Sequence, residues 1–113
     1  MRVFLALVCL VLTGCNRQEK KVIGVVPKGA NHIFWLTVKA GAEKALQGSG
    51  YEMEWKAPDL EIDASRQIAI VESMVNRHVA GIVLAPVHSR SLVGIVERAE
   101  REGIPVALSL IHI

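Results

Sequence analysis

The chain has 113 residues, enough for one small domain or part of a larger one, which excludes a two-lobed enzyme within this length. Lys and Arg number 13 against 11 Asp and Glu, a net charge of +2, and no basic tract indicates nucleic-acid binding. Hydrophobic residues make up 51% of the chain, which excludes a disordered protein.

The first residues are typical of an export signal. Arg2 precedes an apolar run from 3 to 12, which is too short to remain in a bilayer as a permanent helix. The run ends in Leu12-Thr13-Gly14-Cys15, which resembles a lipobox, the bacterial signature that precedes a lipidated cysteine. We therefore expect a lipoprotein signal peptide over 1–14, a lipid anchor on Cys15, and a polar tether over 15–21. An ordinary secretory signal is the alternative.

The next residues predict a strand, a helix and a second strand. The run 22–26 is apolar and β-branched and is closed by Pro27, as expected of a strand buried on both faces. Asn31 or His32 can cap the helix that follows, and glycines at 48 and 50 end it. Its apolar residues, spaced by three or four, are Phe34, Val38, Ala42, Ala45 and Leu46. Residues 51–55 alternate weakly and predict the second strand.

Two further helices and two further strands are expected. Asp63 begins the second helix, and His78 marks its C-terminus, where a cation is favourable. Strands are predicted over 80–85 and 104–108, with a third helix between them that Ser89 caps. The inward residues of the second helix are Ile68, Val71, Met74 and Val75; those of the third are Leu92, Val93, Val96 and Ala99.

Strands separated by helices pair in parallel through right-handed crossovers, because a tight turn cannot reach a parallel neighbour. The sequence therefore predicts an α/β fold with a doubly wound parallel sheet, in the order 2-1-3-4 for the strands present. This order places the first helix on one face and the other two helices on the opposite face. A single helix cannot cover four apolar strands, so we expect part of the first face to be exposed.

The end of the chain has an unusual composition. Residues 108–113 read Leu-Ser-Leu-Ile-His-Ile, which is the translation of the transposon end used in sequencing libraries. We expect 108–113 to be a non-native, adapter-derived tail and 22–107 to be part of the N-terminal lobe of a larger domain. A natural hydrophobic terminus is the alternative.

Ligands of open α/β sheets bind beyond the carboxyl ends of the strands, where helix N-termini offer unpaired N–H groups. Three segments occupy such positions, at 28–35, 57–63 and 86–90. The first holds a cation, amide and imidazole groups and two adjacent aromatic rings. This combination suits a sugar, whose hydroxyls need donors and acceptors while its C–H face packs on an aromatic ring.

A family resemblance supports this interpretation. The segments that carry it are 22–35, Gly41-Ala42, Gln67-Ile68, 81–86 and 103–106, in the order and spacing found at the start of a periplasmic substrate-binding protein. The chain resembles the ribose-binding type over about residues 22–107. The resemblance implies one half of a two-lobed protein that is not an enzyme, that captures a sugar-like ligand and that delivers it to the permease of an ABC importer. It implies an extracytoplasmic, membrane-anchored location. By position it assigns ligand contacts to Lys28, Asn31, His32, Phe34 and Trp35.

Several alternatives remain at the level of the sequence. Lys28 leaves open an acidic or phosphorylated ligand, or a plain surface lysine. Consecutive helix residues point about 100° apart, so Phe34 and Trp35 cannot present the same face, and the pair could instead anchor the helix in the core. A ligand sensor that signals to a chemoreceptor or histidine kinase is an alternative function. An exported α/β enzyme is a distant one, because no catalytic set has recognisable spacing. His32 and His88 have no supporting carboxylate or thiolate, so we expect no metal and no other cofactor.

Overall fold

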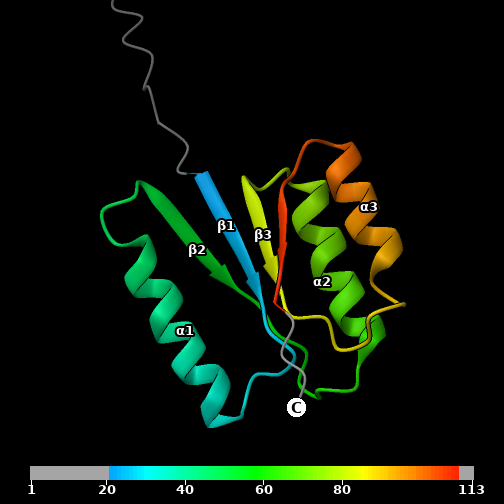
Figure 1. The fold of residues 1–113 in the computed structure, drawn as a ribbon, viewed down its shortest axis with the longest axis horizontal. Coiled ribbons are helices and arrows are strands. Elements are labelled where there is room, and N and C mark those ends of the chain that lie inside the picture. The colour runs from blue at the N-terminus through cyan, green and yellow to red at the C-terminus, as the bar shows by residue number, and fades with distance from the viewer. Residues whose placement is uncertain (1–20, 110–113) are drawn as a thin grey trace, which may run out of the picture.

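The computed structural model describes residues 21–109 as a four-stranded parallel sheet with helices on both faces (Figure 1). In chain order the elements are β1 (Lys21–Val26), α1 (Ile33–Leu46), β2 (Tyr51–Trp55), α2 (Ala64–Asn76), β3 (Gly81–Leu84), α3 (Val93–Arg101) and β4 (Val106–Leu108). The strand order is β2-β1-β3-β4 and every pair is parallel, which confirms the predicted doubly wound α/β fold. Lys21, which we placed at the end of the tether, is the first residue of β1, while the predicted signal peptide and Cys15 lie outside the described residues.

The hydrophobic core lies between the sheet and the helices α2 and α3. The buried residues of α2 are Gln67, Ile70, Val71, Met74 and Val75. Ile70 is buried, whereas Ile68, which we expected inside, is half-buried and packs against the core. Gly24 allows α2 to approach β1 closely, because a Cβ atom there would lie 2.4 Å from the sulfur of Met74.

Helix α3 faces the core as predicted except at Val93. Leu92 and Ala99 are buried and Val96 packs half-buried against the core, all as expected, and Ile95 is buried as well. Val93 is exposed, so the expectation for Val93 is wrong. Positions separated by three, four and seven residues share one face of a helix, whereas Val93 lies about 100° round from Leu92. The expected Ser89 cap is also wrong, since the N-cap residue is Leu92 and makes no side-chain cap hydrogen bond.

Among residues 21–109, the opposite face of the sheet carries only α1, which packs mainly on β2 (Figure 1). Val83, in β3, is aligned with Val25 and with Ala107, so these three side chains belong to one face of the sheet. Val83 is 39% exposed although its strand is internal to the sheet. The structure thus confirms the expectation that part of this face lies open.

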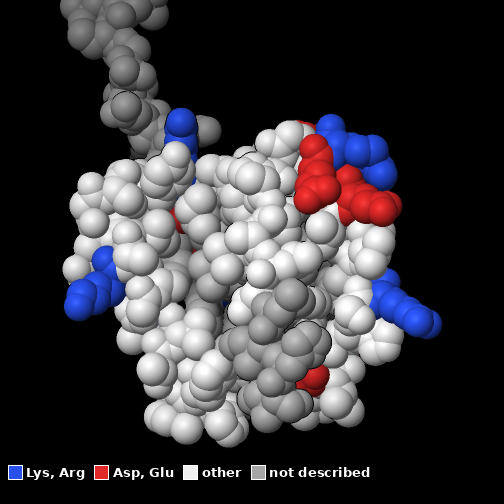
Figure 2. All heavy atoms as spheres, in the orientation of Figure 1, with Lys and Arg blue, Asp and Glu red and all other residues white. Residues whose placement is uncertain are grey.

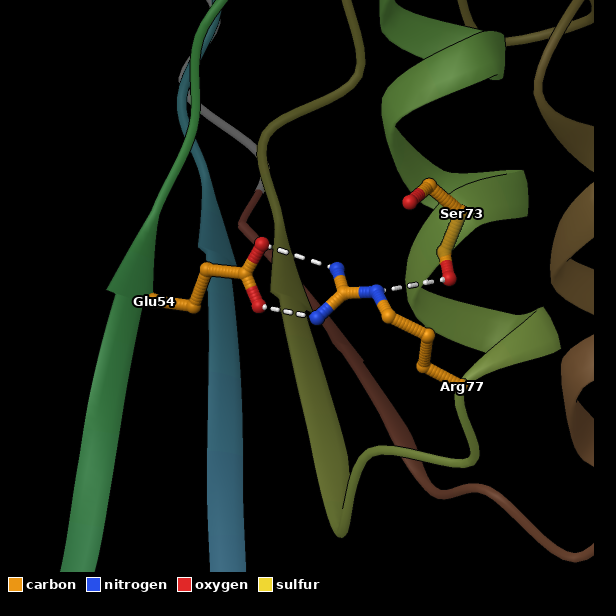
Figure 3. A network of polar contacts seen from close by, with 3 residues as sticks. All are labelled: Glu54, Ser73 and Arg77. Carbon is orange, nitrogen blue, oxygen red and sulfur yellow. Dashed lines mark hydrogen bonds and ion pairs between the residues drawn. The ribbon is translucent and has the colours of Figure 1, made fainter.

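The edge strand β2 is tied to the end of α2 by a bidentate ion pair (Figure 3). Both terminal nitrogens of Arg77 lie 2.8 Å from the two carboxylate oxygens of Glu54, and the Arg77 Nε–H donates to the carbonyl oxygen of Ser73. The Arg77 guanidinium holds the pKa of Glu54 below its ordinary value of 4.5, mainly because it donates hydrogen bonds to the Glu54 carboxylate.

Charged side chains are unevenly distributed over the face of the molecule that Figure 2 shows. Figure 2 shows acidic and basic groups gathered over the C-terminal end of α3, while most of that view is uncharged. There Arg98 Nε lies 3.0 Å from a carboxylate oxygen of Glu102. Within residues 21–109, no helix combines the length and apolar character that crossing a membrane requires.

Candidate ligand-binding site

The strand order brings the carboxyl ends of β2, β1 and β3 together at one edge of the sheet. The chain leaves β1 toward β2 and later returns past it to β3, so the order of crossovers reverses beside β1, where open α/β sheets bind ligands. A cavity of about 390 Å³ lies at this edge. Its walls come from the three loops that follow these strands: Lys28, His32, Phe34, Trp35, Glu61, Ile62 and Val87.

Four of the five predicted contact residues lie together around this cavity. Lys28, His32, Phe34 and Trp35 line it, all from the segment between β1 and the first turn of α1. Asn31 is exposed next to them and is not one of its lining residues. The structure therefore gathers the loop groups as the sequence predicts, with Asn31 at the outside.

Of the two candidate caps of α1, Asn31 and His32, the structure has His32 as the N-cap residue. Its Nδ1 atom accepts a hydrogen bond from the backbone N–H of Phe34 at 3.1 Å. A neutral imidazole that accepts through Nδ1 carries its proton on Nε2. The cap thus leaves His32 with an N–H donor that a ligand oxygen in the cavity can use.

The two aromatic rings of the site are arranged edge to face. The ring centroids of Phe34 and Trp35 lie 4.9 Å apart with an angle of 80° between the ring planes. Trp35 is only 4% exposed, whereas Phe34 is half-buried. The indole N–H of Trp35 donates to Glu61 Oε1 at 2.7 Å. Trp35 therefore packs inward, and Phe34 retains the more accessible ring.

Sequence reasoning identified the other two loops but not the residues that they contribute. Glu61 and Ile62 come from the loop after β2, and Val87 from the loop after β3. Loops lack the periodicity that marks inward positions in helices and strands, so the sequence could not show which of their side chains reach the cavity. The charge of Glu61, three residues before the helix, was the one signal available.

The buried side chain of Gln67, in α2, links the loop that follows β1 to the loop that follows β3. It is 0% exposed, and its amide Nε2 donates to the carbonyl oxygens of Pro27 at 3.1 Å and Ala85 at 2.9 Å. Its Oε1 accepts from the backbone N–H of Val87 at 2.9 Å. One buried side chain thus fixes the spacing between the chain segments that leave β1 and β3. Its position four residues before Val71, on the apolar stripe of α2, was the signal that could have revealed it.

The described part of the chain shows no group of three or more His, Cys, Asp or Glu side chains that could hold a metal ion. His88 instead interacts locally, with its Nδ1 atom 3.0 Å from the hydroxyl oxygen of Ser91.

Residues 23–108 match the family model described as the periplasmic binding protein domain. The D-ribose/D-allose-binding protein of Pseudomonas aeruginosa is 35% identical to the chain, in a match that covers 88% of the chain and 35% of that protein. The D-allose-binding periplasmic protein of Escherichia coli is 34% identical over 71% of the chain and 26% of its own length.

Solved structures agree with this assignment. A solute-binding protein of an ABC transporter from Agrobacterium vitis, with bound D-fucose, matches with a TM-score of 0.75 and 34% identity over 77% of this chain and 30% of that one. One from Burkholderia multivorans matches with a TM-score of 0.74 and 34% identity over 79% and 32%. The chain spans about a third of the length of these relatives, which are solute-binding proteins and not enzymes. The chain belongs to the periplasmic binding protein family.

Proposed function

We propose that this chain belongs to a solute-binding lipoprotein that captures a sugar outside the cytoplasm for an ABC importer. The observation that carries the proposal is the cavity at the carboxyl ends of β2, β1 and β3, where two aromatic rings lie beside Lys28 and His32. A sugar needs such a combination, because its C–H face packs on aromatic rings while its hydroxyls bind polar groups. The relatives that bind D-ribose and D-allose, and the solved structure with bound D-fucose, support the same ligand class.

Each cavity residue has a distinct role in this proposal. Phe34 offers its accessible ring to the C–H face of the sugar, and Trp35 supports that ring edge-on. His32 donates its Nε2–H to a hydroxyl, and the Lys28 amine does the same from the β1 loop. Asn31, at the outside of the cavity, reaches the ligand from the rim.

The proposed mechanism is capture without chemical change. In a two-lobed binding protein, the sugar is held between the lobes, and this cavity supplies one wall. Closure of the lobes on the sugar is favoured because the closed form binds it better than the open form does. The permease then recognises the closed form, so selectivity for the sugar rests on differences in binding free energy.

A binding screen on the complete mature protein tests the proposal. We expect D-ribose, D-allose or D-fucose to raise the melting temperature, because ligand binds only the folded state. Phe34→Ala should weaken affinity by about tenfold, since losing an aromatic contact costs roughly 1–1.5 kcal/mol. Ile33→Ala is the matched control, because Ile33 is 71% exposed on the same turn and does not line the cavity. Equal affinities for the two variants, or no sugar bound, would contradict the proposal.

The anchoring part of the proposal has its own test. We expect Cys15→Ser to abolish incorporation of an alkyne-labelled fatty acid in bacterial cells and to release the protein from the membrane fraction. Cys9→Ser is the control, because Cys9 lies within the proposed signal peptide and not at its cleavage site. Labelling that survives in Cys15→Ser would show that the chain is not lipidated there.

A further inference from the structure

Among the described residues that line the cavity, Glu61 is the one acidic residue, and the β1–α1 segment contacts it at two points. Its Oε1 atom accepts the indole N–H of Trp35 at 2.7 Å. Its side-chain stem passes over Gly29, where a Cβ atom would lie only 2.6 Å from Glu61 Cγ. Although Glu61 is exposed overall, both ends of its side chain are held by the loop that forms the aromatic wall.

The bond to Trp35 does more than pair two polar groups. Trp35 is 4% exposed, so its N–H has little access to water and would lose a partner if the carboxylate were removed. A hydrogen bond to a carboxylate is shorter and stronger than one between neutral groups. The bond therefore fixes the indole plane, and the edge-to-face contact of 4.9 Å transmits this orientation to Phe34.

We infer that Glu61 is a positioning residue of the sugar site, which holds Trp35, and through Trp35 the ring of Phe34, in the orientation against which the ligand packs. This inference rests on the proposed function and adds the residue that pre-organises its aromatic wall. Because the indole N–H is occupied by Glu61, Trp35 offers the ligand only its ring. Among its described lining residues, the cavity also places one carboxylate, Glu61, with one ammonium group, Lys28. We infer from this balance of charge that the site favours a neutral sugar over a sugar acid or sugar phosphate.

The environment of Trp35 can be followed by spectroscopy, because these 113 residues contain only one other tryptophan, Trp55. In a complete mature protein in which Trp55 and every tryptophan outside these 113 residues are replaced by Phe, tryptophan fluorescence and the tryptophan bands of near-ultraviolet circular dichroism report on Trp35. We expect Glu61→Ala to weaken the near-ultraviolet signal and to increase quenching by acrylamide, without ligand present. Glu61→Gln should restore both signals, because its amide oxygen can still accept the indole N–H. Glu72→Ala, on the exposed side of α2, should leave them unchanged.

Sugar binding provides the second readout. We expect Glu61→Ala to weaken affinity for D-ribose or D-allose by about five- to tenfold, and Glu61→Gln to retain most of it. D-ribose 5-phosphate should bind wild type at least tenfold more weakly than D-ribose does. Glu61→Gln should reduce this ratio of the two dissociation constants, because it removes the negative charge of the carboxylate.

Three results separate the inference from the proposed function. Unchanged Trp35 spectra and affinity in Glu61→Ala would overturn the positioning role while sugar binding stands. Equal affinities for ribose and its phosphate in wild type would overturn the neutral-ligand assignment. If wild type binds no sugar at all, the proposed function and the sugar role of Glu61 both fall, and the spectra without ligand still decide whether Glu61 orients Trp35.

Discussion

His78 occupies a backbone position that glycine would fill more easily. Its φ of 51° is left-handed, and it follows the C-cap residue Arg77 of α2. The His78 N–H donates to Val75 and the next N–H, of Val79, donates to Met74, which is the Schellman pattern. The end of α3 repeats this pattern with Gly103 at the corresponding position, with φ of 80°. The sequence placed His78 correctly at the end of α2 but could not show its left-handed backbone.

We expect His78→Gly to raise the free energy of unfolding by up to about 1 kcal/mol, because glycine adopts a positive φ without steric cost. Chemical denaturation of the complete mature protein measures this change. Gly103→Ala is the opposite test at the matching position and should lower stability by about 1 kcal/mol. A destabilised His78→Gly would show that the imidazole makes a contact that outweighs the backbone strain.

The Glu54–Arg77 pair makes stability depend on pH. Folding lowers the pKa of Glu54 below 4.5, so the pair stabilises the protein above that value and its contribution is lost as pH falls through the lower, folded-state pKa. Glu54 is 21% exposed and its partner is more exposed, so we expect Glu54→Gln to cost no more than about 1 kcal/mol at pH 7.

Denaturation curves of wild type and Glu54→Gln from pH 7 to pH 2.5 check this pH dependence. The two stabilities should converge as the pH falls through the lowered, folded-state pKa of Glu54, because below it the carboxyl is protonated in both states. Glu72→Gln is the control, because Glu72 lies on the exposed side of α2. Its free energy of unfolding should stay within about 0.5 kcal/mol of the wild-type value at pH 7. If the free energies of unfolding of wild type and Glu54→Gln differ by the same amount over the whole pH range, the pair with Arg77 does not lower the pKa of Glu54.

At the scale of secondary-structure elements, Gln67 links α2 to the roots of two binding loops. We expect Gln67→Leu to lower the free energy of unfolding by roughly 3 kcal/mol, because the backbone groups of Pro27, Ala85 and Val87 lose a buried partner. Sugar affinity should fall in parallel, because the loop after β3 supplies Val87 to the cavity.

The same substitution at an exposed glutamine is the control for Gln67. Gln47 follows α1 and is exposed, so Gln47→Leu should change stability by less than about 0.5 kcal/mol. Denaturation midpoints of the two variants provide the comparison. If Gln67→Leu and Gln47→Leu lower the free energy of unfolding equally, the three hydrogen bonds of Gln67 do not stabilise the fold as we propose.

The elements were predictable to different extents for physical reasons. Strands such as β1 are continuous apolar runs between breakers, and their parallel order follows from the lengths of the helical connections. The sequence did not show which of Val93 and Ile95 faces the core, because this depends on where α3 begins. We took Ser89 as the cap, whereas the helix follows Leu92, and Ile95 rather than Val93 is buried. Both residues are apolar, so hydrophobicity alone could not distinguish them.

For the site, the sequence could group residues that are neighbours in the chain, but it could not show which distant segments meet them. The group from Lys28 to Trp35 is continuous in sequence, so its composition alone indicated a sugar. Glu61 lies 26 residues from Trp35, and only the parallel pairing of β1 and β2 brings the two loops together. The role of Gln67 depends in the same way on the pairing of β1 with β3.

At the scale of the whole molecule, the open sheet face governs how these 113 residues behave alone. Val83 and Leu36 are exposed apolar residues on the α1 side. We expect the 113-residue chain to bind a hydrophobic dye such as ANS strongly and to bind D-ribose or D-allose at least a hundredfold more weakly than the complete mature protein does. Calorimetry on both proteins checks this, and micromolar sugar binding by the 113-residue chain would contradict it.

A crystal structure of the complete mature protein with D-ribose or D-allose would test the proposed site most directly. We predict that the sugar lies at the carboxyl ends of β2, β1 and β3, with its C–H face within about 4 Å of the Phe34 ring. Its hydroxyls should bind His32 Nε2 and the Lys28 amine, with Trp35 still bonded to Glu61. A sugar bound away from these loops, or a Phe34 ring turned from it, would contradict the proposed site.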